Sequence, residues 1–205
     1  MKILIACEFS GILRESFRKK GYNAFSCDLL PSEIPSPYHI QDNVLNILNE
    51  GWMMMIAFPP CTYLCNSGVR WLYERPERWK KMEEAVDFFL KLLNAPIYHI
   101  CIENPIPHKF AMQKIGKYTQ IIQPYQFGEP YSKATCLWLK NLPLLSPTQL
   151  LPKSMVIQKV HREPPSADRW KNRSRTYKKI AEAMVEQWGA YIKLEKFSKE
   201  LPKKR

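Results

Sequence analysis

Cys61 is the residue best placed for chemistry in this sequence, because it directly follows Pro59 and Pro60 at the end of an apolar run. The run 53–58 is short and continuously apolar, so it predicts a buried strand. Proline cannot extend a central strand, and its fixed φ stiffens the turn that carries the cysteine. Since α/β proteins place their chemistry at the carboxyl ends of parallel strands, we interpret Cys61 as a reactive thiol; a buried core cysteine is the alternative.

A carboxylic acid follows the next strand-like run. The residues 97–102 are mostly apolar, and they lead into Glu103-Asn104-Pro105. A thiolate is a good soft nucleophile, and a neighbouring carboxyl group can supply a proton. Such a pair suits the addition of sulfur to C6 of a pyrimidine while N3 gains a proton, which makes C5 nucleophilic toward an electrophilic methyl group. Cys61 and Glu103 are therefore the candidate catalytic pair.

Alternating strands and helices are expected to position these groups. Strands are predicted over 2–7, 23–27, 53–58, 97–102 and 134–139, and helices over 12–20, over 77–94 and from Tyr177 onward. Continuous apolar runs are typical of strands that are buried on both faces of a parallel sheet. In such a sheet Gly11, Asp28, Cys61 and Glu103 would share the carboxyl edge. We therefore predict an α/β fold, with a mostly parallel sheet and flanking helices.

The composition indicates a globular protein with an excess of positive charge. Of the 205 residues, 45% are hydrophobic and 24% are charged, as in ordinary folded domains. We expect one domain over 1–205 that ends in a flexible basic tail at about 190–205. The formal net charge of +12 favours a polyanionic partner, and nucleic acid is the first candidate. A charged surface that serves only solubility is the alternative.

The cysteine pattern and the apolar runs bear on metals and membranes. The six cysteines do not form paired CxxC clusters, so no metal site is expected. No apolar run is long enough to cross a membrane, and Met1 leads into a strand rather than a signal peptide. We therefore expect a cytoplasmic protein with reduced thiols and no membrane partner. The oligomeric state is left open.

The ordered motifs resemble those of the DNA cytosine-5 methyltransferases, and more closely those of compact, phage- or prophage-type methyltransferase-like proteins without a target-recognition domain. The stretch 59–62 is similar to the proline–cysteine nucleophile motif, and 103–105 is similar to the Glu-Asn-Val motif. The resemblance implies a Rossmann-like, S-adenosylmethionine-dependent methyltransferase fold. It also implies methylation of cytosine C5 in DNA through a covalent adduct between Cys61 and C6, with Glu103 at N3.

The resemblance also implies a cofactor pocket and a substrate surface. Residues expected to bind S-adenosylmethionine are Phe9, Ser10, Gly11, Asp28, Asp42, Pro59 and Ser174. Residues expected to contact the substrate are Asn104, Lys133, Trp170 and Arg173. The stretch 9–11 is similar to the core of the Phe-x-Gly-x-Gly cofactor loop. The stretch 172–174, expected to open the final helix, corresponds to the segment that closes the cofactor pocket. The basic region 162–179 is a candidate for binding phosphates.

Departures from the family pattern leave the substrate open. Leu13 or Arg14 stands where the second glycine of the cofactor loop is expected, and the interval 145–168 is too short for a target-recognition domain. One alternative is therefore C5 modification of a free pyrimidine nucleotide or of single-stranded nucleic acid by the same cysteine chemistry. Another is a nucleic-acid-binding protein that has lost catalysis.

Overall fold

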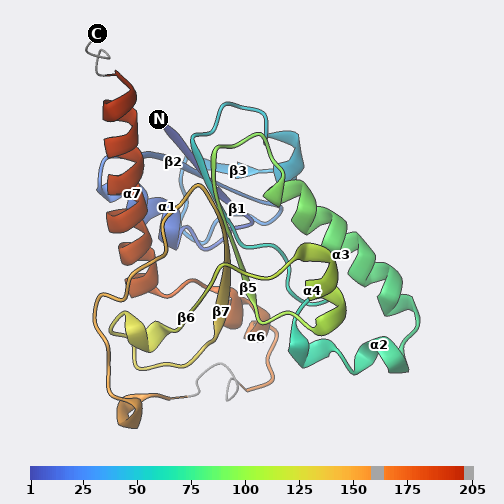
Figure 1. Ribbon diagram of the computed structural model, residues 1–205. Helices are drawn as coiled ribbons and strands as arrows, with labels where there is room; N and C mark the ends of the chain where they lie inside the picture. Colours follow the sequence, from blue (N-terminus) through green and yellow to red (C-terminus); the bar gives the residue numbers. More distant parts are fainter. Residues whose placement is uncertain (158–163, 201–205) are drawn as a thin grey trace.

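The computed structural model describes residues 1–157 and 164–200, and within them a single seven-stranded sheet forms the centre of the molecule (Figure 1). The strands are β1 (Lys2–Ala6), β2 (Asn23–Asp28), β3 (His39–Gln41), β4 (Met54–Ala57), β5 (His99–Pro105), β6 (Gln120–Ile122) and β7 (Thr135–Lys140). Strands β1 to β5 pair in parallel, whereas β7 runs antiparallel to both β5 and β6. The expected mostly parallel α/β sheet is confirmed.

The strand order creates a crevice at the carboxyl edge of the sheet. The order is β3-β2-β1-β4-β5-β7-β6, so the direction of winding reverses between β1 and β4. In open α/β sheets, ligands bind outside the carboxyl ends of the strands at such a reversal. The antiparallel β7 lies between β5 and β6, at one side of the mostly parallel, Rossmann-like sheet that the sequence predicted.

Helices cover both faces of this sheet. They are α1 (Ile12–Lys19), α2 (Trp71–Glu74), α3 (Glu77–Leu93), α4 (Lys109–Ile115), α6 (Arg169–Ser174) and α7 (Lys178–Glu200). In Figure 1, α1 and α7 lie on one side of the sheet and α3 and α4 on the other. Successive side chains of a strand alternate between the faces, so Ile3 and Ile5 pack with α1 and α7 while Leu4 packs with α3.

The two long helices follow the spacing of their apolar residues. On α3, Met82, Val86 and Phe89 recur at intervals of three or four and are buried, as expected for one face of a helix. On α7, Met184 and Trp188 are buried in the same way. Helix α7 extends to Glu200, through much of the segment expected as a tail, and 201–205 lie outside the described residues. None of the described helices has both the length and the apolarity needed to cross a membrane.

The structure departs from the sequence-based boundaries near β5 and α6. Strand β5 continues through Glu103, since β7 pairs with it as far as Pro105 opposite Thr135. The segment 172–174 was expected to open the final helix, and that expectation is wrong. It ends the separate short helix α6, because the chain leaves helical geometry at Arg175 (ψ 137°) before α7 begins.

Candidate active site

Cys61 lies in a tight turn just beyond the carboxyl end of β4. The backbone amides of Leu64 and Cys65 both donate to the Cys61 carbonyl oxygen, at 3.0 and 2.9 Å. Two neighbouring helices hold this turn. The Arg78 guanidinium of α3 donates to the Thr62 carbonyl at 3.2 Å, and a ring nitrogen of His108, the residue before α4, lies 3.0 Å from the Tyr63 carbonyl. The thiol is therefore presented on a braced loop, as the two prolines indicated.

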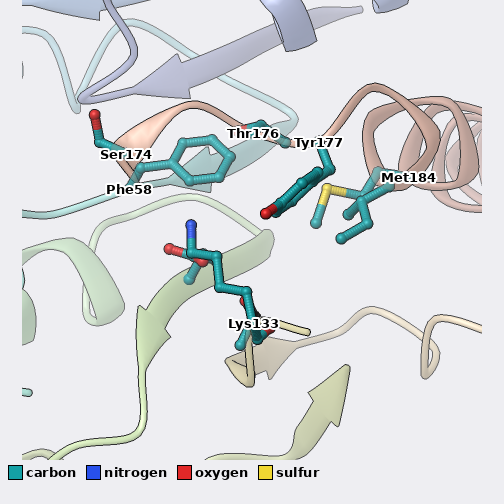
Figure 2. A pocket seen from close by; sticks show the side chains of 9 residues that line it. Phe58, Lys133, Ser174, Thr176, Tyr177 and Met184 are labelled. Carbon is teal, nitrogen blue, oxygen red and sulfur yellow. Dashed lines mark hydrogen bonds between the residues drawn. The ribbon is translucent and has the colours of Figure 1, made fainter. Parts of the chain in front are cut away.

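Glu103 lines a pocket at the same edge of the sheet. The pocket is walled by Phe58, Glu103, Lys133, Thr135, Ser174, Thr176, Tyr177, Ile180 and Met184. Figure 2 shows Lys133 extending toward Phe58, while Ser174 and Tyr177 come from α6 and the segment before α7. Its empty volume is about 300 Å³, including the part open to solvent.

Nearby charges and burial shift the pKa values of Glu103 and Cys61. Burial raises the pKa of the Glu103 carboxyl, while the Lys133 ammonium and the hydrogen bond with Thr135 lower it. The pKa of the Cys61 thiol is raised, first by its hydrogen bond with Cys65 and then by burial; the Glu103 charge raises it further, and Lys133 lowers it. The thiol, the carboxyl and the ammonium group are thus close enough to interact, although they come from three separate segments.

Glu8, two residues after the end of β1, holds the expected cofactor loop. Its carboxylate accepts from the backbone amide of Leu13 at 2.7 Å, from that of Arg14 at 3.4 Å, and from the Ser10 hydroxyl at 3.2 Å. It caps the start of α1, where a negative charge is favourable. Glu8 was not among the residues predicted from the sequence, although an acid between a strand and a helix start is a recognisable signal for this role.

Arg14 fills the space beside Gly11. Gly11 has a φ of +72°, a left-handed conformation that favours glycine, and an added Cβ would lie 2.7 Å from an Arg14 guanidinium nitrogen. The fully buried guanidinium donates to Ser26 Oγ at 2.7 Å and to Ser32 Oγ at 3.1 Å. It also donates to the Ile34 carbonyl at 2.8 Å. A buried cation therefore stands where the second glycine was expected, and its hydrogen bonds connect α1 to β2 and to the segment 32–34 that follows β2.

The segment after β2 packs against the expected cofactor loop 9–11. The Glu33 amide donates to the Phe9 carbonyl at 2.8 Å, and the Glu33 carboxylate accepts two bonds from Arg175, at 2.6 and 2.9 Å. Trp170 of α6 also packs on the Phe9 ring, with 5.7 Å between the ring centroids. Phe9, Ser10 and Gly11 consequently lie buried beneath residues that come from both ends of the chain.

Replacement of Glu8 by glutamine is expected to remove one component of the pH dependence of stability. Burial raises the pKa of Glu8 from 4.5 to about 7. The folded carboxyl thus binds its proton more tightly than the unfolded one, so the free energy of unfolding falls as the pH rises from 4.5 to 7. The full effect is about 3 kcal/mol. The free energy of unfolding is measured by urea denaturation at pH 5 and at pH 8. Its decrease between these two pH values should be smaller in the Glu8→Gln variant than in the wild type, by about this amount. The exposed Glu84→Gln variant, as control, should behave like the wild type; equal losses in all three proteins would contradict the prediction.

Asp28, the last residue of β2, and Asp42, the residue after β3, differ in burial and in their hydrogen bonds. Asp28 is partly buried, and its carboxylate accepts from the backbone amides of Leu29 and Leu30. A carboxylate has about four acceptor sites, so Asp28 keeps capacity for a ribose diol. Asp42 is exposed, and its carboxylate accepts from the Asn43 amide at 2.6 Å and from the Asn46 side chain at 3.0 Å. Its contacts are those of a turn and helix-start residue.

The other expected site residues fall into two groups. Lys133 and Ser174 line the pocket with Glu103, and Pro59 is buried beside it in the chain after Phe58. Asn104 is fully buried and lies on the opposite face of β5 from Glu103, where its amide donates to the Pro105 carbonyl at 2.7 Å. It supports the strand end and does not line the pocket.

The two substrate-binding candidates on α6 lie at the surface next to the pocket. Trp170 is 52% exposed, and Arg173 is partly exposed with its carbonyl accepting from the Lys133 ammonium at 3.1 Å. The first residues of the expected basic region 162–179, Arg162 and Glu163, lie outside the described residues. Within the described part of the chain, no group of three or more His, Cys, Asp or Glu side chains is placed to hold a metal ion.

Fold and site together define a Rossmann-like α/β protein with a thiol and a carboxyl group at neighbouring strand ends. No protein-family model matches the chain, and no curated protein matches it significantly. Solved structures with a similar fold include a candidate DNA modification methyltransferase encoded within a prophage of E. coli, with 13% sequence identity and a TM-score of 0.48 over 80% of this chain and 55% of that chain. Another is the methyltransferase EhMeth of Entamoeba histolytica, with 16% identity and a TM-score of 0.44 over 73% of this chain and 56% of that chain. The chain therefore spans a little over half the length of each.

Proposed function

We propose that this protein methylates cytosine at C5 in DNA, with Cys61 as the nucleophile and S-adenosylmethionine as the methyl donor. The observation that carries the proposal is the approach of Cys61, Glu103 and Lys133 at one edge of a Rossmann-like sheet, where the charges of Glu103 and Lys133 act on the Cys61 thiol and that of Lys133 acts on Glu103. A thiol, an acid of raised pKa and a cation are the three groups that nucleophilic activation of a pyrimidine needs.

Each of these groups has a defined task in the proposed reaction. The Cys61 thiolate forms a bond to C6, and the electrons of the C5–C6 double bond shift while Glu103 donates a proton to N3. Lys133 stabilises the negative charge that develops on the ring. After C5 has been methylated, its proton is lost to water, the sulfur–carbon bond breaks toward Cys61, and the N3 proton returns to Glu103. The raised pKa of Glu103 favours the protonated form that the first step requires.

The residues at the carboxyl edge fit S-adenosylmethionine in their chemistry. When bound, this cofactor supplies an electrophilic methyl group on a sulfonium cation. Asp28 retains acceptor capacity for the ribose hydroxyls. Phe58 and Tyr177 present aromatic faces in the pocket, and such faces favour a cation. Gly11 is packed against Arg14 and Ile34, so these two side chains limit the space beside the loop.

Replacement of Asp28 by asparagine is expected to weaken S-adenosylmethionine binding about tenfold or more, because a charged acceptor for the ribose diol is lost. Isothermal titration calorimetry measures this directly. The matched control is Asp87→Asn on α3, an exposed acid that is paired with Lys91. An unchanged dissociation constant for Asp28→Asn would place the ribose elsewhere.

The charge of the chain and an exposed aromatic residue support DNA as the substrate. The net charge of +12 attracts phosphates. A duplex base must leave the stack to reach Cys61, at a cost of a few kcal/mol. Trp170, half-exposed and packed on Phe9, is suited to stack on a displaced base, and Arg173 beside it to contact a phosphate.

Nucleoside mass spectrometry tests the proposal and its alternatives. Duplex DNA, single-stranded DNA and dCMP are each incubated with the protein and S-adenosylmethionine, and 5-methylcytosine is measured. Product on duplex DNA is the expected result. Product on dCMP or single strands alone would favour the alternative substrates, which the short interval 145–168 makes chemically reasonable. Absence of product together with DNA binding that Cys61→Ala leaves unchanged would favour a binding protein.

A further inference from the structure

The segment 106–108, which directly follows β5, lies against the turn 61–66 that carries the proposed nucleophile. Two backbone hydrogen bonds join the segment to the turn: the Asn66 amide donates to the Ile106 carbonyl at 2.8 Å, and the His108 amide donates to the Leu64 carbonyl at 2.9 Å. Between these bonds the two stretches are bridged in antiparallel fashion. The strand that carries Glu103 and the turn that carries Cys61 are therefore connected just beyond the proposed site.

The buried ring of His108 supplies a third connection, and its contacts decide which ring nitrogen carries the proton. Its Nδ1 accepts from the backbone amide of Ala111 at 3.1 Å, which caps the start of α4. A nitrogen that accepts a hydrogen bond has no proton of its own, so the proton of the imidazole is on Nε2. Nε2 lies 3.0 Å from the Tyr63 carbonyl oxygen and therefore donates to it. One side chain thus caps α4 and holds the turn two residues beyond Cys61.

The two prolines before Cys61 leave the turn dependent on such bonds. The sheet holds the chain as far as Phe58, whose amide donates to the Ala6 carbonyl at 3.0 Å. The next two residues, 59–60, are prolines without an amide hydrogen, so they cannot donate a bond that anchors the turn. Glu103, in contrast, is held within β5 by its pairing with β7. The position of the Cys61 sulfur relative to the Glu103 carboxyl therefore depends on the bonds that follow the cysteine.

We propose that His108 is a positioning residue for methyl transfer: its Nε2 proton holds the Tyr63 carbonyl, and this bond keeps the Cys61 sulfur where it can attack C6. The inference rests on the proposed function, in which Cys61 is the nucleophile and Glu103 the acid. His108 touches no reacting atom and transfers no proton. Displacement of a catalytic group by about 1 Å can lower a rate about 10²-fold, so the loss of one such bond is measurable. The contact of Arg78 with the neighbouring carbonyl remains, so the turn should loosen rather than unfold.

Two substitutions separate this role from that of a helix cap. In His108→Asn the side chain has a polar atom at the position of Nδ1 but none at that of Nε2, so it can cap α4 but cannot reach Tyr63. In His108→Gln the amide nitrogen corresponds to Nε2, so the bond to Tyr63 is kept while the cap is lost. Stability should follow the cap. Because asparagine is a favoured N-cap, the melting temperature of His108→Gln should lie about 2–4 °C below that of His108→Asn.

The methylation rate should instead follow the bond to Tyr63. Under single-turnover conditions His108→Asn should be about 10–100-fold slower than the wild type, and His108→Gln should remain within about threefold of it. The dissociation constants for DNA and S-adenosylmethionine should not change. A rate that is kept in His108→Asn and lost in His108→Gln would overturn the inference, because it would follow the cap. Ile106→Ala is the control: it changes a neighbouring exposed side chain but keeps the backbone bond to Asn66, and it should match the wild type.

Hydrogen exchange of the turn amides makes the test independent of catalysis. It is measured by NMR without DNA or cofactor. The amides of Leu64, Cys65 and Asn66 should exchange about tenfold faster in His108→Asn than in the wild type, and His108→Gln should stay close to the wild type. Unchanged exchange in His108→Asn would overturn the hold on the turn. The expected exchange pattern in a protein that never methylates cytosine would overturn the proposed function and leave this hold established. Methylation by His108→Asn at the wild-type rate would do the reverse.

Discussion

The Cys61→Ala variant is expected to lose methyl transfer by at least about 10⁴-fold, because removal of a nucleophile leaves only binding and electrostatic contributions. In the proposed reaction the Cys61 sulfur forms the bond to C6, and alanine has no atom that can replace it. Nucleoside mass spectrometry of the product measures this loss. Single-stranded or duplex DNA that contains 5-fluorocytosine gives a second readout, since fluorine at C5 cannot leave as a proton does and the covalent adduct persists. The wild type should form a complex that survives denaturing electrophoresis, and Cys61→Ala should form none.

Cys136→Ala is the matched control for this experiment. Cys136 is buried on the face of β7 opposite Glu103, so its loss affects packing rather than the pocket. We expect this variant to keep activity and adduct formation, with a modest loss of stability of about 1 kcal/mol. Adduct formation by Cys61→Ala, or loss of the adduct in Cys136→Ala without unfolding, would show that another cysteine is the nucleophile.

The Glu103→Gln variant is expected to lower the methylation rate about 10²–10⁴-fold, as is usual when a positioned proton donor is removed. Glutamine has a similar shape and can still form a hydrogen bond to the cytosine edge, so DNA binding should change little. The rate constant is measured under single-turnover conditions and the dissociation constant by fluorescence anisotropy. A similar loss in both quantities would assign Glu103 to binding rather than to proton transfer.

The pH profile of the same variant gives a second check with a defined sign. Burial raises the pKa of Glu103, and the protonated form is the active one. The wild-type rate should therefore fall as the pH rises through this pKa, and the Glu103→Gln variant should lack that descending limb. The exposed Glu84→Gln variant on α3 serves as control and should keep it. A descending limb that remains in Glu103→Gln would have to come from another group.

The sequence by itself determined the central sheet, the two long helices and the edge at which the site lies. Two kinds of pattern are local signals: the apolar runs of β1, β2 and β4, and the spacing of Met82, Val86 and Phe89 on α3. A strand that is buried on both faces needs consecutive apolar residues, and a helix that is buried on one face needs them every three or four residues, so both patterns are visible in the sequence. Parallel pairing then brings the carboxyl ends of the strands together, whatever the remaining contacts are. Asp28, Cys61 and Glu103 could therefore be placed at one edge before any contact was known.

Only the tertiary structure decided which side chains complete that edge. Strands β3 and β6 have three residues each and α4 has seven, and such short elements are stabilised by their neighbours rather than by their own sequence. Lys133 approaches Glu103 because β7 pairs along β5, and Glu33 meets Arg175 across 142 residues of chain. The burial of Arg14 likewise depends on the residues packed around it. Residue type and spacing reveal what a side chain can do, but the solvation and charge that decide whether it does so come from residues that only the folded chain brings near.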